Sequence, residues 1–220
     1  MESLNSGDIT PFYTFDPMQG LAARELADIL DSARKGEDDG FLTLTTTHPL
    51  VAKKLEDEGI VLTNGRTGIE WDDATILFIA LRATQPDGSP AEPLDRGVSR
   101  DRLGRFPTND GNAIAYLRAN LIPESEDNPG SQLLTQMDVG LRKETRGHDN
   151  LSIGFGGMSL HGWLSATDVT LLRTNLQKSA WKVSKNESFD GGVRDVVRHL
   201  IIILKTAEKR NLGILMRAHD

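Results

Sequence analysis

The chain has 220 residues, of which 38% are hydrophobic and 26% charged, and it contains no cysteine. This composition is typical of globular proteins, so we expect a single domain over residues 1–220 rather than a disordered chain. Without cysteine, disulfides, thiolate nucleophiles and cysteine-based zinc sites are excluded. No apolar run is long enough for a membrane helix, and the N-terminus lacks the features of a secretory signal. We therefore expect a soluble, cytoplasmic protein with no membrane partner.

The net charge of −7 is distributed unevenly along the chain. Residues 1–140 carry 24 acidic and 12 basic side chains, whereas residues 141–220 carry 8 acidic and 13 basic ones. The acidic part repels nucleic acid, and no nucleic-acid recognition motif is present, so we expect no nucleic-acid ligand. The simplest interpretation of the asymmetry is that the two parts pack together and neutralise each other. The alternative is that the basic part binds an acidic partner or a phosphate.

The N-terminal part predicts helices and strands in alternation. Residues 21–35 repeat their apolar side chains with helical spacing, which predicts an amphipathic helix. Residues 42–45 alternate leucine with threonine and predict a strand. Pro49 is typical of the first turn of a helix, which we expect to end near residue 58. Residues 60–62 predict a further strand before the Asn-Gly turn signal.

The middle of the chain predicts a central strand and a long loop. Residues 74–84, ATILFIALRAT, are apolar on both faces over the length of a strand, which is typical of the middle of a sheet. Residues 85–112 are rich in proline, glycine and arginine without an apolar period, so we expect a long surface loop. Residues 113–122 are compatible with a short helix or a strand. Residues 131–142, SQLLTQMDVGLR, predict a strand.

The segment GFGGMSLHGW, residues 154–163, predicts a bulged strand. Ile153 and Phe155 share one face, and the pair Gly156 and Gly157 inserts an extra residue before the alternation resumes. The glycine spacing fits neither the dinucleotide-binding motif nor a phosphate loop. The pattern therefore favours a bend over a ligand cradle, although Gly156 and Gly157 stay candidates for ligand binding.

The last third of the chain gives the clearest pattern. Ser165 and Asp168 have the spacing of a capping box, which predicts a helix from there to about residue 178. Residues 192–210 repeat apolar side chains with helical spacing, and the residues after Asn211 predict a final strand. On one flank of the long helix the spacing gathers basic side chains beside an isoleucine. These candidates for partner binding, the basic stripe, are Arg194, Arg198, Ile202, Lys205 and Lys209.

These patterns together predict an α+β fold. We expect one mixed sheet of about five to seven strands covered by three to four helices. The long C-terminal helix is followed by a final strand, which we expect to return to the same sheet.

Two histidines and two arginines are the candidates for chemistry. The five histidines show no metal-binding spacing, so we expect no metal and no cofactor. His48 and His161 fall at predicted junctions between strand and helix, where ligands commonly bind. They form an acid–base pair only if both junctions lie at the same sheet edge. Arg100 and Arg102 of the long loop have the chemistry to close over a phosphate or carboxylate. Capping, packing or solvation explains each of the four residues more simply.

The sequence leaves three functions open. The first is a non-enzymatic binding protein, such as an inhibitor, an immunity-type or a regulatory module, whose acidic surface meets a basic protein partner. The second is a small enzyme or sensor for a phosphorylated or otherwise anionic small molecule, with His48, His161 and the loop arginines as its site. The third is a structural subunit of a larger assembly that uses the basic stripe. No catalytic motif is present, so we rank the binding protein first.

Overall fold

The computed structural model describes residues 12–19, 23–95, 103, 111–125, 127–178 and 181–219. Within these ranges the main sheet has three antiparallel strands in the order β1, β5, β3, and a smaller sheet pairs β2 with β4. No helix in them combines the length and the apolar character needed to cross a bilayer. The strands are β1 (Phe12–Met18), β2 (Leu121–Pro123), β3 (Ser159–Leu164), β4 (Trp181–Val183) and β5 (Gly213–His219).

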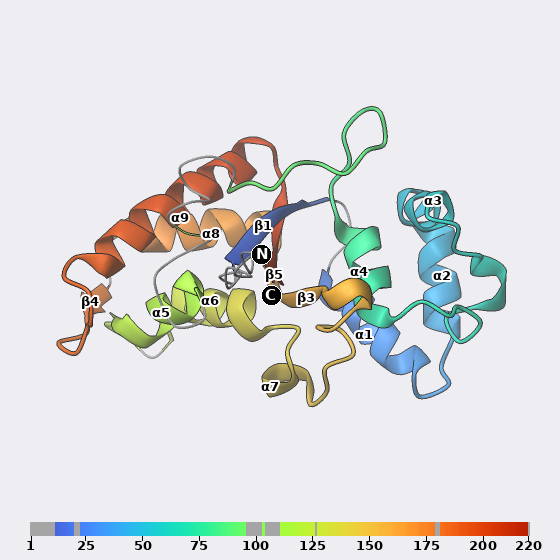
Figure 1. Ribbon diagram of the computed structural model, residues 1–220, viewed down its shortest axis with the longest axis horizontal. Helices are drawn as coiled ribbons and strands as arrows, with labels where there is room; N and C mark the ends of the chain where they lie inside the picture. The colour runs from blue at the N-terminus through green and yellow to red at the C-terminus, as the bar shows by residue number, and fades with distance from the viewer. Residues whose placement is uncertain are drawn as a thin grey trace, which may run out of the picture.

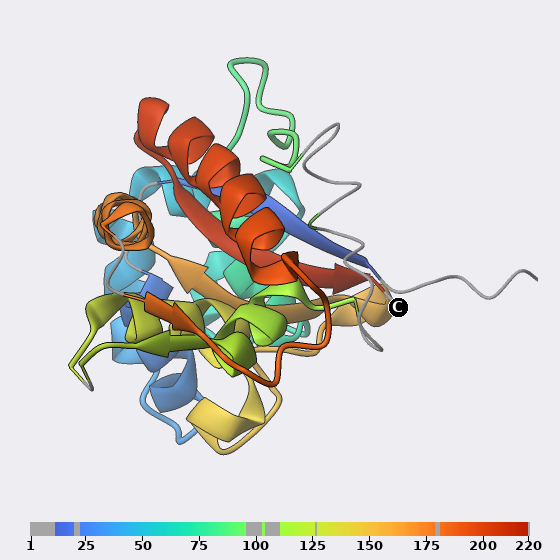
Figure 2. The same cartoon turned by 90° about the vertical axis from the view of Figure 1, so that its left-hand side faces the viewer.

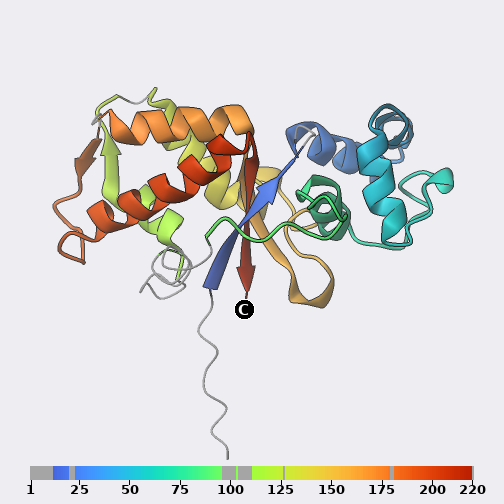
Figure 3. The ribbon, with the colours of Figure 1, turned by 90° about the horizontal axis from the view of Figure 1, so that it is seen from above.

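Helices cover both faces of the main sheet (Figures 1 and 3). One side carries α1 (Ala23–Ala33), α2 (Asp39–Thr47), α3 (Pro49–Asp57) and α4 (Asp73–Leu81). The other side carries α5 (Ala113–Asn120), α6 (Pro129–Val139), α8 (Ala166–Gln177) and α9 (Gly192–Lys209). Figure 2 looks from this second side and shows α9 running alongside β5 and β1. The short elements are α7 (Lys143–Arg146) and the single turns η1 (Leu62–Asn64) and η3 (Phe155–Gly157).

The main sheet separates two apolar clusters, because successive side chains of a strand point to opposite faces. In β5, Ile214 and Met216 belong to the cluster under α5, α6, α8 and α9, whereas Leu215 belongs to the cluster under α1 to α4. In β1, Phe15 and Met18 divide in the same way. All three strands therefore contribute to both clusters.

Five predicted elements are confirmed. The structure contains the helices expected over residues 21–35, 49–58, 165–178 and 192–210, as α1, α3, α8 and α9. The final strand is β5, and it does return to the main sheet. At the start of α8 the Ser165 hydroxyl accepts from the Asp168 main-chain N–H, and the Asp168 carboxylate accepts from the Ser165 N–H, which completes the capping box.

Four predicted strands are wrong, and the sheet is accordingly smaller than the five to seven mixed strands expected. Residues 42–45, 74–81 and 131–139 lie in α2, α4 and α6, and residues 60–62 form no strand. In α2 the threonine hydroxyls donate to carbonyls one turn earlier, which satisfies them inside a helix. Eight of the nine residues of α4 are buried, so its apolar character on all sides reflects a helix packed all round. The sequence did not predict β1, β2 or β4.

A glycine on β3 allows α6 to lie directly against the sheet. A Cβ atom built at Gly162 would overlap the Gln136 carbonyl oxygen and lie 2.8 Å from that of Met137. The neighbouring His161 is the bulged residue of β3, since the pairing with β5 passes from Leu160 directly to Gly162. Contact between the α6 backbone and the strand therefore depends on the missing side chain.

We expect Gly162→Ala to lower the free energy of unfolding by about 3 kcal/mol, because neither backbone can retreat without disturbing the core. Urea unfolding followed by circular dichroism measures this difference. Gly40→Ala is the matched control: its Cβ would lie 3.5 Å from Ile29 Cγ1, an ordinary contact inside α2. We expect it to change stability by no more than about 1 kcal/mol, in the stabilising direction. Equal losses in the two variants would contradict the packing argument.

Lys54 of α3 is a buried cation that joins two helices. Its ammonium donates to the carbonyl oxygens of Ala80 (3.2 Å) and Arg82 (2.7 Å) at the C-terminus of α4, where helix carbonyls lack partners. Burial, with a smaller contribution from the Arg82 charge, lowers the pKa of Lys54 from 10.5 to about 8. The unfolded chain therefore binds this proton more tightly than the folded chain does.

The stabilising effect of a neutral Lys54 is fully present above pH 10.5 and is lost as the pH falls through about 8. We expect the stability of the wild type minus that of Lys54→Met to rise between these values, by at most about 3 kcal/mol. Urea unfolding at a series of pH values measures the difference. Lys53→Met removes the adjacent ammonium, which is 69% exposed. A rise of the same size in that control would assign the effect to overall charge.

Candidate functional site

The acidic segment that forms α1 to α4 and the basic segment that includes α8 and α9 lie on opposite sides of the main sheet. Residues 23–82, which include α1 to α4, carry 12 acidic and 7 basic side chains, and residues 166–210, which include α8 and α9, carry 5 and 9. Some charges do pair between the two parts: Arg146 contacts Asp28 at 2.6 Å, and Arg217 contacts Asp16 at 3.0 Å. The sheet keeps the two helical layers apart (Figures 1 and 3). The second layer also includes α5 and α6, and residues 111–139 carry 4 acidic and 1 basic side chains, so the basic character of that layer comes from residues 166–210.

The first half of the glycine-rich segment forms a tight turn ahead of β3, and the bulge of the strand lies at His161 rather than at the glycine pair. Ile153 bridges to Ser159, and the Gly154 N–H donates to the Met158 carbonyl at 2.9 Å, so the chain reverses direction between them. Gly156 and Gly157 have φ angles of 67° and 79°, which glycine adopts without strain. A Cβ atom on either would meet no atom within 4 Å. These two glycines form the bend itself, and no close contact with the described residues requires them.

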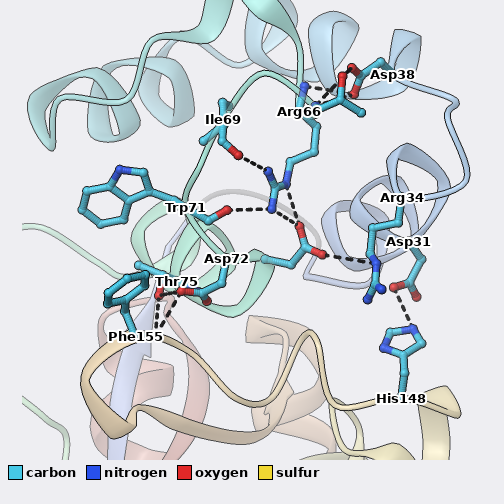
Figure 4. Close-up of polar contacts among 12 residues, drawn as sticks. Asp31, Arg34, Asp38, Arg66, Ile69, Trp71, Asp72, Thr75, His148 and Phe155 are labelled. Carbon is cyan, nitrogen blue, oxygen red and sulfur yellow. Dashed lines mark hydrogen bonds and ion pairs between the residues drawn. The ribbon is translucent and has the colours of Figure 1, made fainter.

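The turn presents Phe155 to solvent on a fixed backbone. The Phe155 side chain is 76% exposed, and its N–H donates to the Asp72 carboxylate at 3.1 Å and the Thr75 hydroxyl at 3.3 Å. A Cβ atom on Gly154 would come within 2.9 Å of that hydroxyl and 3.0 Å of that carboxylate. Asp72 also caps α4 by accepting from the Thr75 N–H at 2.7 Å. The turn is therefore tied to the N-terminus of a buried helix (Figure 4).

A buried ion pair fixes the neighbouring loop that carries Trp71. The Arg66 guanidinium donates to the Asp73 carboxylate at 2.6 Å, and to the carbonyls of Ile69 at 2.9 Å and Trp71 at 2.7 Å. Burial raises the pKa of the Asp73 carboxyl, an effect that the charge of Arg66 opposes. Arg66 itself is held because its main-chain N–H donates to Asp38 at 2.9 Å. The backbone on both sides of Trp71 is thus anchored (Figure 4).

We name Trp71, Ile153 and Phe155 the aromatic patch. Their exposed fractions are 37%, 57% and 76%. Figure 4 shows the Trp71 and Phe155 side chains projecting to the same side, away from the Arg66 network. Exposed aromatic side chains on an anchored backbone are typical of interaction surfaces. The sequence contained one signal for this site: in GFGG, a phenylalanine stands between glycines. A regular strand packed in a sheet does not need glycines on both sides of an aromatic residue.

His161 lies in a buried polar network on the other face of the sheet. Its Nδ1 is 2.9 Å from the Asp138 main-chain oxygen, which only accepts, so the proton is on Nδ1. The Asp138 carboxylate also receives the Asn112 amide at 2.7 Å and pairs with Arg118. Burial opposes ionisation of Asp138, but hydrogen bonds from His161, Arg118 and Asn112 outweigh it and hold its pKa below the usual range. Tyr13 packs edge-on against the imidazole at 5.1 Å.

The structure does not bring the two candidate histidines together. His48 lies between α2 and α3, so the strand expected before it is absent, whereas the helix expected after it is present. His161 lies inside β3, and α2 and α3 are at one end of the molecule (Figures 1 and 3). Arg100 and Arg102 lie outside the described residues. The described part of the 85–112 loop includes the buried Asp95, which accepts from the Phe15 N–H at 3.1 Å.

The basic stripe is exposed along α9, as its helical spacing predicted. Ile202 is 48% exposed, and the four basic side chains around it are exposed as well. Arg198 pairs with Asp195 of the same helix at 3.1 Å. The stripe therefore faces solvent on the side of the molecule opposite α1 to α4.

Comparisons with protein-family models, with curated proteins and with solved structures each gave no match for this chain. Among the described residues, no three histidine, aspartate or glutamate side chains lie close enough together to hold a metal ion.

We expect Asp72→Ala to release the Phe155 turn, because this carboxylate anchors both the turn and the first turn of α4. The amide hydrogen of Phe155 should exchange faster, and stability should fall by about 1 kcal/mol from the lost cap. Hydrogen exchange measured by NMR reports both effects. Asp72→Asn keeps only one acceptor oxygen, whereas the α4 cap and the Phe155 N–H use different oxygens, so it should retain the cap and lose part of the protection at Phe155. Unchanged exchange at Phe155 in the alanine variant would show that other contacts hold the turn.

Proposed function

We propose that this protein is a binding module whose aromatic patch docks onto a basic protein partner. The observation that carries the proposal is the exposure of Phe155 on a backbone that Asp72 and Thr75 hold in place. An exposed phenylalanine costs free energy in water, and the anchoring prevents it from folding back onto the protein. Since the backbone that carries Phe155 is already held in place, covering this side chain costs little backbone conformational entropy.

The charge of the neighbouring layer selects the kind of partner. The patch lies at the N-terminus of α4, inside the layer of residues 23–82 that carries 12 acidic and 7 basic side chains. Glu70 is exposed directly beside Trp71. A protein that offers an apolar recess bordered by lysine or arginine complements both properties, and the opposite charges speed its approach. An inhibitor, immunity-type or regulatory module uses this kind of surface.

The basic stripe is the competing docking surface. Its charge suits an acidic partner, and Ile202 supplies one exposed apolar side chain at its centre. The patch is favoured because it combines two aromatic side chains with an anchored backbone, whereas the stripe consists of long, flexible side chains on a helix surface. The enzyme or sensor interpretation keeps only the fixed orientation of His161, because the structure separates this residue from His48.

Quantitative capture tests the proposal. Immobilised wild type and Phe155→Ala are compared in extract from the native cell at about 50 mM and about 300 mM salt. We expect a basic protein that the wild type retains at low salt, that salt releases, and that the variant loses. With the purified partner, Phe155→Ala should weaken binding by about 2 kcal/mol, or about thirtyfold, by calorimetry.

Two further variants decide between surfaces. Leu171→Ala removes an apolar side chain of α8 that is 43% exposed, on the other side of the sheet, and should leave binding unchanged. The double variant Lys205→Gln/Lys209→Gln removes half of the charges of the basic stripe. Loss of the partner in this double variant, with full binding by Phe155→Ala, would refute the aromatic patch and assign docking to α9.

A further inference from the structure

A cleft of about 410 Å³ lies where α1 meets α6, α7 and β3, away from the aromatic patch. Its volume is within the range of small-molecule sites, about 300–1,000 Å³. Side chains from four separate elements line it, so its shape exists only in the folded chain. We propose that this cleft binds a small molecule through a carboxylate or phosphate group.

One wall of the cleft is formed by a tryptophan that lies beside Gly140. Trp163 of β3 is 5% exposed and borders the cleft. A Cβ atom at Gly140, just after α6, would lie 3.2 Å from the indole ring and would overlap the Gln136 carbonyl oxygen. Because residue 140 has no side chain, the indole edge is not covered from that direction. The ligand can place a flat or apolar portion against it.

Arg146 is held beside this wall in a fixed position. Its Nη1 contacts the carboxylates of Asp28 at 2.6 Å and Asp31 at 3.5 Å, and its Nε donates to the Gly140 carbonyl at 3.4 Å. Its guanidinium carbon lies 5.8 Å from the centre of the Trp163 ring. These contacts leave Nη2 without a hydrogen bond to the described residues. One N–H edge of an oriented guanidinium is therefore available to a ligand oxygen.

The remaining lining gives the cleft an excess of donors. The side chains of Arg24, Gln132 and Thr145 form no hydrogen bond or ion pair within the described part of the chain, and all three border the cleft. The carboxylate of the lining, Asp28, is already paired with Arg146. Arg24 itself forms no ion pair with either carboxylate near Arg146, Asp28 or Asp31, and guanidinium groups bind carboxylate and phosphate oxygens strongly. An anionic oxygen group satisfies this set of donors.

Tryptophan fluorescence tests the site directly, since Trp71, Trp163 and Trp181 are the three tryptophans of the chain. In the full-length double variant Trp71→Phe/Trp181→Phe, all indole emission comes from Trp163. We expect a saturable change in emission on titration with inorganic phosphate or with citrate at constant ionic strength, with Kd of about 1 mM. A response to phosphate alone identifies phosphate esters as the ligand class, and a response to citrate alone identifies carboxylates.

Variants in this background decide whether the cleft is responsible for the change in emission. Arg24→Gln, which removes one positive charge from the cleft, should weaken binding about tenfold, and Gln132→Ala should weaken it less. Lys35→Gln removes one positive charge just after α1, outside the cleft, and should leave Kd unchanged. Absence of a saturable response to both anions, or equal weakening by Arg24→Gln and Lys35→Gln, would overturn the proposal. Phe155→Ala should leave the titration unchanged, so this test is independent of the docking function.

Discussion

The pairing of β5 with both of its neighbours is the interaction on which the rest of the structure depends. This last strand lies between β1 and β3, and Ile214, Leu215 and Met216 are fully buried on its two faces. In the pairing of β1 with β5, Thr14 lies opposite Arg217, although nearly the whole chain separates the two positions in sequence. Both apolar clusters take residues from this strand. Neither helical layer has a complete core until the C-terminal residues are in place.

Polar contacts then convert this scaffold into defined surfaces. Asp72 links the cap of α4 to the Phe155 turn, and Arg66 links Asp73 to the loop around Trp71. On the other face Asp138 joins His161 to α5 through Asn112 and Arg118. In each case a carboxylate with several partners holds segments from different parts of the chain. The backbone at both aromatic residues of the patch is held in this way: Arg66 binds the Trp71 carbonyl, and Asp72 binds the Phe155 N–H.

Charge is distributed differently over these surfaces. The layer of α1 to α4 is acidic and carries the aromatic patch, whereas α9 presents the basic stripe on the opposite side. The cleft lies where Arg146 from the second part of the chain reaches Asp28 and Asp31 of the first. At this point the charges of the two parts meet, and Arg24 lines the cleft without an ion pair to either carboxylate. The proposed docking surface and the proposed small-molecule cleft are thus separate features of one fold.

The sequence by itself determined the elements with local signals: the capping box of Ser165 and Asp168, Pro49 at the start of α3, and the amphipathic period of α9. Only the tertiary structure decided that residues 74–81 form a helix, because a segment buried on all sides is apolar all round in a helix as in a central strand. The exposure of Phe155 was decided in the same way. Its turn is anchored by Asp72, 83 residues earlier, and no local pattern reports a contact between positions so far apart.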